Sequence, residues 1–584
     1  MRAPGRLAAA SVALAIAATL GACAPALPDT VDAGTEVVVG WAAELTSLNP
    51  VAAPTPGNLD IAAVTRDGFG DIVDGEFVAD PAFGKVSMID GGAFTVRYDL
   101  AEPAWSDGIP LDGADLMLGW AAAAGLLDDS ASGEPAPPGT EPPLATPTPK
   151  LDEFARAIEV AFPAPTISWQ SAVRADVPAH VVGRIAFGID DPMEAKQAVI
   201  GAIQERDERA LGEIAEAWRD GFALDEDFAL SEGEASPETF VSSGPYRVAA
   251  VARAADGQSV TLVPNGAYRG APSPQVARVE LVPPGDAPLG EIGERLDIAT
   301  VAPVVENRAP VRELERRDTG VQTTHDGTVW TVLLRPAGVF GGAPARSAFL
   351  RSIPASDLID RGAGEWSSAY TKTTALTAAP GSRAFDIVSE DSGFASTLGA
   401  AADDGALERE AAGVAAGTAV CVLYDRTSAF AAGAFSALRD AVGEEGWSAT
   451  DCGSDDLNGA LAGGAWDAVI TRVEVPDSVA GLKALWGIGT TSAVTAQVVG
   501  PLAAGQEAID RDALLAELDR TVDVYQAREL RAQIEATLVR SAIAKPLAAN
   551  PRVTVVDKDV TGVTVRNGPR AQLLSGAAQW KVEP

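Results

Sequence analysis

The sequence predicts a mixed α/β protein with more than one domain. The chain has 584 residues and is 47% hydrophobic, so it can bury several cores, and two or three domains are expected. Residues 94–99 alternate apolar and polar side chains, as a half-buried strand does, and a turn and a helix follow. Residues 418–475 favour strand, helix, strand, helix, strand. Strands and helices therefore alternate in at least two separate stretches of the chain.

The turn after the first of these strands has the sequence Trp105-Ser-Asp-Gly108. Asp107 is expected to accept a bond from the backbone ahead of it, and Gly108 to adopt a positive φ. Asp112 is expected to cap the following helix. The predicted buried side of that helix carries Ala114, Leu116, Met117 and Trp120.

The charge of the chain excludes one class of partner. The formal net charge is −37, and no run of Lys or Arg is present. Phosphate binding needs a basic face, so no nucleic-acid partner is expected. We interpret the excess acid as a solvated surface.

The N-terminus has the pattern of a secretory signal. Arg2 and Arg6 precede an apolar run, Leu7–Leu20, that is too short to span a bilayer. Leu20-Gly-Ala-Cys23 follows it and resembles a bacterial lipobox. We expect residues 1–22 to be a lipoprotein signal peptide, Cys23 to be lipidated and residues 23–35 to be a tether. Loss of Arg2 and Arg6 would make the mature side-chain charge −37 − 2 = −39.

Two further cysteines, Cys421 and Cys452, lie at predicted strands of one β-α-β-like segment. In an oxidising compartment we favour a disulfide between them, with two buried thiols as the alternative. His180 and His325 are too distant in sequence to complete a zinc site, so no metal or cofactor is expected. His180 is a ligand or base candidate, but a structural histidine is the favoured interpretation.

Several segments resemble, in the same order, the family 5 solute-binding proteins, which are the peptide and nickel receptors of ABC importers. The segments are Leu45–Pro50, the W-S-D-G turn Trp105–Gly108, Ser242-Ser-Gly-Pro-Tyr-Arg-Val248 with Asn265–Gly270 after it, Ala345–Ile353, Gly464–Ile470 and Lys545–Leu547. Gly244 and Pro245 of the third segment are expected to form a sharp turn into a strand.

The resemblance implies a two-lobed periplasmic-binding-protein-like α/β fold with a small extra domain inserted in lobe 1. Residues 36–60, 181–300 and 546–584 are assigned to lobe 1, residues 61–180 to the inserted domain and residues 301–545 to lobe 2. An exposed insertion is expected at 128–150, and helices at 194–222 and 523–546.

The implied function is that of a lipid-anchored solute receptor at the outer face of the cell membrane. It would bind short peptides as a monomer and deliver them to an ABC permease. The alternatives are a receptor for nickel chelates or oligosaccharides, and a cell-surface interaction module that has lost transport.

No catalytic signature supports an enzyme. A G-x-S-x-G elbow, an H-E-x-x-H helix and an S-x-x-K pair do not occur in the sequence. With 81 acidic residues, a chance carboxylate pair is not excluded, but nothing singles one out. We therefore expect no enzymatic activity.

The candidate ligand-binding residues follow from the resemblance. They are Thr55 and Asn58, in a loop expected to pass the cleft, together with Trp330, Arg472 and Asp477. Peptide-binding relatives carry a G-W-x-x-D segment whose Asp pairs with the amino terminus of the ligand. Here the run is Arg472-Val-Glu-Val-Pro-Asp477, in which Asp477 falls about one position late and the Gly-Trp pair is missing. Pro476 restricts the backbone, so Asp477 either points into the cleft or forms a surface turn.

Overall fold

The structure is a computed structural model that describes residues 28–128, 142–152, 154–400, 404–568 and 573–583. The predicted signal peptide and the lipidation candidate Cys23 lie outside these residues, as does part of the predicted insertion at 128–150. Within the part described, no helix combines the length and the apolar character needed to cross a membrane.

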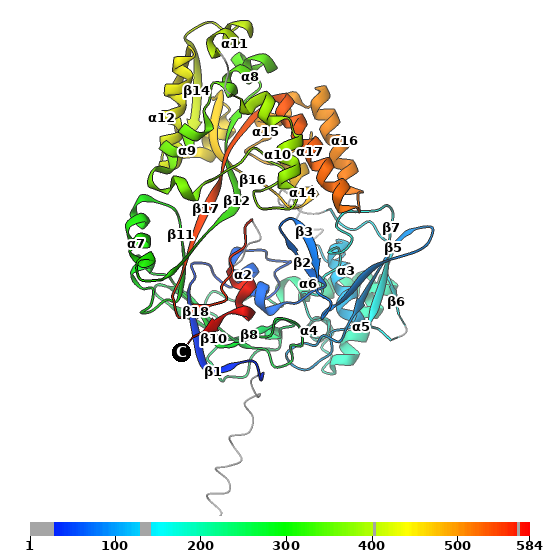
Figure 1. Cartoon of the computed structure of the whole chain (residues 1–584). Helices are drawn as coiled ribbons and strands as arrows, with labels where there is room; N and C mark the ends of the chain where they lie inside the picture. The colour runs from blue at the N-terminus through cyan, green and yellow to red at the C-terminus, as the bar shows by residue number, and fades with distance from the viewer. Residues whose placement is uncertain (1–27, 129–141, 153, 401–403, 569–572, 584) are drawn as a thin grey trace, which may run out of the picture.

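One large mixed sheet extends through both halves of the molecule (Figure 1). Its strands lie in the order β15 (Trp447–Asp451), β14 (Thr418–Tyr424), β16 (Ala468–Glu474), β12 (Gly320–Leu334), β17 (Ala544–Val556), β11 (Ile298–Val301), β1 (Asp32–Gly40), β10 (Val276–Val282), β9 (Gly257–Pro264) and β8 (Tyr246–Ala254), with β13 (Thr371–Lys372) paired to β17. The long strands β12 and β17 are antiparallel partners, from Gly320 opposite Val556 to Leu333 opposite Ala544.

These two strands connect two separately packed lobes. The C-terminal end of β17, from Val553 to Val556, pairs with β11. The C-terminal end of β12, from Thr328 to Leu334, pairs with β16. The largest hydrophobic cluster takes its residues from 37–298 and 556–580, whereas two others take theirs from 329–548. Since the two sets of buried side chains do not overlap in sequence, each lobe has its own core. In Figure 1 the first lobe lies below and the second above.

Among the described residues, the first lobe also holds three small sheets and five helices, and one of these sheets pairs β18 (Val560–Thr561) with β19 (Lys581–Val582). The hairpin of β2 (Gly70–Val73) and β3 (Glu76–Ala79) stands apart from the four-stranded sheet. That sheet has the order β4 (Gly84–Ile89), β5 (Phe94–Leu100), β7 (Ala157–Phe162), β6 (Lys150–Leu151). The helices are α2 (Pro56–Thr65), α3 (Gly113–Ala123), α4 (Ala179–Phe187), α5 (Pro192–Glu205) and α6 (Glu208–Asp220). The buried side chains of this sheet and these helices join the core of the first lobe.

The second lobe is covered by helices. They are α7 (Val305–Glu315), α8 (Ala343–Arg351), α9 (Ala355–Ala363), α10 (Phe385–Asp391), α11 (Gly405–Ala411), α12 (Ala429–Glu444), α13 (Leu457–Gly463), α14 (Val479–Trp486), α15 (Ala496–Val499), α16 (Gln506–Asp519) and α17 (Val524–Ser541). α14, α16 and α17 face the first lobe in Figure 1.

The predicted strand, turn and capped helix are confirmed. Asp107 accepts a bond from the amide of Ile109, Gly108 has a φ of +87°, and the Asp112 side chain caps α3. The fully buried Asp115 carboxylate accepts bonds from Trp105 Nε1 and Lys196 Nζ, at 3.2 and 3.0 Å, and from two backbone amides. The turn is therefore fixed to α3 and α5 through one buried charge.

A second predicted turn packs against the first. The amide of Ser106 donates to the Ser242 carbonyl over 2.8 Å, and the amide of Ser242 donates to Ser106 Oγ over 3.0 Å. The chain bends at residues 243–245 and enters β8 at Tyr246, as expected, although the φ of Gly244 is not positive. A Cβ at Gly244 would lie 2.7 Å from the carbonyl oxygen of Val64, so glycine is needed for close approach to α2.

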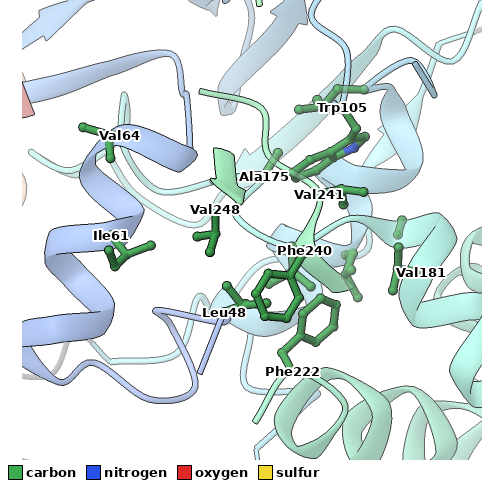
Figure 2. Close-up of a cluster of buried hydrophobic side chains, with 14 of the residues drawn as sticks. Leu48, Ile61, Val64, Trp105, Ala175, Val181, Phe222, Phe240, Val241 and Val248 are labelled. Carbon is green, nitrogen blue, oxygen red and sulfur yellow. The ribbon is translucent and has the colours of Figure 1, made fainter. Parts of the chain in front are cut away.

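Figure 2 shows the apolar cluster around these turns. Ile61 and Val64 of α2 lie on one side and Val181 of α4 on the other, with Phe222 and Phe240 between them. Complete burial of a Phe or Val side chain contributes about 1.5–3 kcal/mol each. This cluster holds α2, the entry to β8 and α4 in one unit.

The helical stretch predicted at 194–222 is confirmed but divided in two, and the helix predicted at 523–546 was wrong at its end. Residues 194–222 form two helices because Arg206 adopts a left-handed conformation and Asp207 caps α6. The helix predicted to reach residue 546 ends at Ser541, where Ala542 has a φ of +48°. Ile543 and Lys545 therefore do not continue the helix, and Lys545 belongs to β17.

Candidate functional site

A cavity of about 930 Å³ lies between the two lobes. Its walls come from the β2–β3 hairpin, α3, the loop 162–172 and the end of α6 in the first lobe, and from the loop 377–384, residues 475–479 and α17 in the second. A cavity of this volume falls within the range of small-molecule binding sites. Because the cavity lies between the lobes, it is open when the lobes are apart and enclosed when they are close together.

The first lobe supplies an apolar wall. Aromatic rings of Phe77, Trp169 and Trp218 line the cavity, and small residues of α3 lie at its base. Gly119 of α3 has no room for a side chain, because a Cβ there would lie 1.6 Å from the carbonyl oxygen of Arg174. The glycine lets α3 approach the chain segment that follows Trp169.

The second lobe supplies a charged wall. Arg528 and Arg531 lie about one turn apart on α17, and both line the cavity. Arg531 donates to the carbonyl oxygens of Thr377 and Asp477 over 2.8 and 2.5 Å. Burial lowers the pKa of the Arg531 guanidinium, and Asp477 and Glu76 act in the opposite direction.

One buried carboxylate positions the loop that forms part of this wall. Glu535 of α17 accepts bonds of 2.9 Å each from the amides of Leu376 and Thr377 and from Thr377 Oγ1. Burial raises the pKa of Glu535 to about 7. The loop 376–379 is thus tied to the same helix that carries the two arginines.

The structure places Asp477 in the wall of the cavity. The residue follows β16, is half-buried and lies beside the turn of the β2–β3 hairpin. Pro476 also lines the cavity. Of the two interpretations left open for Asp477, its position in the cavity wall favours the one in which it faces the cleft.

Thr55 and Asn58 are not among the residues that line this cavity. Thr55 is exposed and caps α2 by accepting from the amide of Asn58. The Asn58 side chain is buried and accepts from the amides of Thr46 and Ser47 over 2.8 and 3.1 Å. Both residues shape the loop, whose neighbouring residues Val51 and Ala52 do line the cavity.

Trp330 and Arg472 also lie outside the lining. Trp330 is 7% exposed, stacks on Phe430 with ring centroids 4.4 Å apart and donates to Asn550. Arg472 pairs with Asp326 over 3.3 Å and lies over the Trp330 ring. These contacts are structural and belong to the face of the β12–β16 pair.

Sequence reasoning missed three charged residues that line the cavity, Glu76, Arg528 and Arg531. The helix that holds the two arginines was expected, but its pattern does not show which side chains face a cleft. Among the described residues, no group of three or more His, Cys, Asp or Glu could hold a metal ion.

The remaining predicted pair lies at the edge of the second lobe. Cys421 on β14 and Cys452 after β15 are joined by a disulfide in this structure, with Cα atoms 5.6 Å apart. His180 is 1% exposed and pairs with Asp107 over 2.9 Å, which fits the structural interpretation of this histidine. Neither feature reaches the cavity.

Comparison of the sequence with known proteins gives a partial match. No family model matches the chain. It is 35% identical over 114 residues to uncharacterized lipoproteins of Mycobacterium tuberculosis and Mycobacterium bovis. This match spans 19% of the chain and 20% of the relative's length.

Solved structures resemble the whole chain. The periplasmic EDTA-binding protein EppA has a TM-score of 0.71 at 14% identity, with 96% of this chain and 98% of that one covered. The ABC transporter substrate-binding protein CtaP of Listeria monocytogenes has a TM-score of 0.67 at 14% identity, covering 94% and 100%. The murein tripeptide-binding protein MppA, in its unliganded open form, has a TM-score of 0.62 at 12% identity, covering 94% and 98%.

These likenesses extend over almost the entire chain and include both lobes. They confirm the predicted fold class: the chain has the two-lobed α/β fold of periplasmic substrate-binding proteins.

Proposed function

We propose that this protein is the extracytoplasmic solute receptor of an ABC importer. The observation that carries the proposal is the cavity of about 930 Å³ that lies between two lobes, each with its own core. Binding sites of this kind lie at domain interfaces, where apolar walls bury the ligand and a few polar groups orient it. The fold shared with EppA, CtaP and MppA supports the same assignment.

The mechanism follows from the connection between the lobes. β12 and β17 pass from one lobe to the other, and their register shifts between His325 and Val329. A change of backbone angles at this irregular point would rotate one lobe against the other. A solute that contacts both walls binds the closed form better, so it shifts the open–closed equilibrium, and the permease recognises the closed form.

The solute we favour is a short peptide. The cavity offers aromatic faces at Trp169 and Trp218 for side chains, and the carboxylate of Asp477 for an amino terminus. Charge-assisted contacts at the ends of a peptide leave its side chains in roomy apolar pockets. MppA, a murein tripeptide-binding protein with the same fold, supports this choice.

Two other candidates rest on specific observations. The likeness to an EDTA-binding protein favours a metal chelate. The metal would then arrive within its chelate, since the described residues form no cluster of three metal ligands. An oligosaccharide would use the Trp169 and Trp218 faces, and an interaction module that has lost transport would bind none of these solutes.

The membrane attachment belongs to the same proposal. Lipidation at Cys23 would hold the receptor at the outer face of the cell membrane, next to the permease. The partial match to mycobacterial lipoproteins supports the anchor. The residues that would support the cleft without lining it are Thr55, Asn58, Trp330 and Arg472. The receptor would act as a monomer.

A thermal-shift screen of the mature chain tests the proposal. A solute at 100 times its Kd adds about 2.7 kcal/mol to the stability of the folded state. Stabilisation by di- to octapeptides supports the peptide receptor. Stabilisation by metal chelates or oligosaccharides alone selects those alternatives, and no stabilisation by any class favours the interaction module.

A further inference from the structure

The tip of the β2–β3 hairpin reaches across the cavity to the second lobe. Glu76 Oε1 accepts from Arg528 Nε over 2.6 Å and lies 2.6 Å from the other Arg528 nitrogen in contact with it. Glu76 Oε2 lies 3.5 Å from an Arg383 nitrogen. Figure 1 shows the hairpin extending from the lower lobe towards the orange helices of the upper one.

The backbone of the hairpin supports the same contact. Asp74 and Gly75 both have a positive φ, which makes the turn tight and places Glu76 directly after it. The Asp74 carbonyl accepts from the amide of Arg383 over 3.1 Å. At the base of the hairpin, Asp71 pairs with Arg566 over 2.9 Å. The hairpin is therefore held at its base as well as at its tip.

A second bridge closes another part of the cavity wall. The amide of Ile167 in the loop 162–172 donates to the Asp519 carbonyl over 2.9 Å. The Ile167 side chain also packs against the core of the second lobe. Apart from Arg383, the residues of both bridges line the cavity, so contacts of the protein with itself connect the lobes there.

The charges of the first bridge are shielded from solvent. The Glu76 and Arg528 side chains are 16% and 18% exposed. Both Arg528 nitrogens contact the same oxygen of Glu76, and a charge-assisted hydrogen bond that is shielded from water is stronger than an exposed pair. Removal of Glu76 would leave the Arg528 charge partly buried without this counterion, and removal of Arg528 would leave Glu76 only the more distant Arg383.

We infer that Glu76, Arg528 and Arg383 form a clasp that holds the lobes closed over the cavity before a solute binds. This inference rests on the proposed function. The clasp would set the fraction of protein molecules in the closed form, which is the form that retains a solute. A variant with a smaller closed fraction would bind the solute more weakly in proportion. Closure itself can be measured without any solute.

The test measures the distance between the lobes. Spin labels are attached at Asp90→Cys and Glu410→Cys, both exposed, in the mature chain carrying Cys23→Ser. Cys421 and Cys452 are bonded and do not react. Glu76→Gln and Arg528→Gln should each lower the closed-to-open ratio at least about threefold, and the double variant should lower it no further.

The matched control is Asp440→Asn. Asp440 pairs with Arg361 over the same 2.6 Å, but both residues belong to the second lobe and are half-exposed. This variant should keep the wild-type distance distribution. The clasp is refuted if Glu76→Gln keeps that distribution too while its circular dichroism shows a folded chain. A failed solute screen would refute the receptor and leave these distances as they are.

Discussion

Glu535 and Thr377 are joined by two hydrogen bonds, because one carboxylate oxygen of Glu535 accepts from both the amide and the hydroxyl of Thr377 at 2.9 Å. The pair ties α17 to the loop 377–384, which lines the cavity. The bonds form inside the protein, where the burial that raises the pKa of Glu535 to about 7 disfavours its charged form.

This burial predicts a pH dependence of stability. The pKa of Glu535 is higher in the folded chain than its ordinary value of 4.5, so its stabilising contribution is complete below that value and is lost as the pH rises through about 7. The loss is on the order of 3 kcal/mol. Glu535→Gln should therefore flatten the fall in unfolding free energy between pH 4.5 and 7, measured by urea denaturation.

Asp67 supplies the control for that experiment. Its pKa is also raised to about 7 by burial, and it lies in the first lobe, far from α17 in sequence. Asp67→Asn should remove a separate part of the same pH dependence, and the two effects should add. An unchanged profile in Glu535→Gln would contradict the assignment of a raised pKa to this residue.

A disulfide is predicted between Cys421 and Cys452. Peptide mapping of the exported protein without reductant should show the two residues linked. Replacement of both by serine should lower the unfolding free energy by about 3 kcal/mol for a loop of this size. If both cysteines are recovered as thiols that react with an alkylating agent, the disulfide prediction is wrong.

Lipidation is predicted at Cys23. Cys23→Ser should release the protein from membranes into the soluble fraction or leave an uncleaved precursor, as judged by fractionation and immunoblotting. Cys421→Ser, which leaves the lipobox intact, should remain in the membrane fraction. A Cys23→Ser protein that is processed and membrane-bound like the wild type would disprove the lipobox.

Asp477 is predicted to bind the amino terminus of a peptide. Asp477→Asn keeps the shape of the side chain and removes its charge, so it should weaken peptide binding by about 1 kcal/mol or more, as the loss of a charged hydrogen bond does. Acetylation of the peptide amine should weaken binding to the wild type by a similar amount and have little further effect on the variant. Peptide binding that is indifferent to Asp477 would refute this role.

The fold could be predicted because its diagnostic segments make the contacts that build it. Ser106 and Ser242 come from two recognisable turns and hydrogen-bond to each other across 136 residues. Trp105 donates to Asp115 of α3, and Asp112 caps the same helix. In such segments the residue types themselves are dictated by the buried contacts, so the sequence carries the information.

The cavity could be predicted only in part. Asp477 was found because it follows a recognisable strand, whereas Glu76 and Arg528 pair across 452 residues of sequence. With 81 acids and 44 basic residues in the chain, no spacing distinguishes this pair from surface charges. The helix end at Ala542 was also missed. Ala542 adopts a left-handed φ, and an alanine gives no sign of this in the sequence, as a glycine would.

The central claim is that the cavity between the lobes binds a small solute. The measurement that tests this claim is titration calorimetry with di- to octapeptides, metal chelates and oligosaccharides. The mature wild-type chain and its Ala122→Trp variant are titrated in parallel. Ala122 lines the cavity, whereas Ala462 is exposed on α13 and serves as the control position for the same substitution. The account predicts that at least one solute binds the wild type and Ala462→Trp alike and binds Ala122→Trp at least about tenfold more weakly, a loss of about 1.4 kcal/mol. Binding that Ala122→Trp leaves unchanged, or no binding of any solute to the wild type, would contradict it.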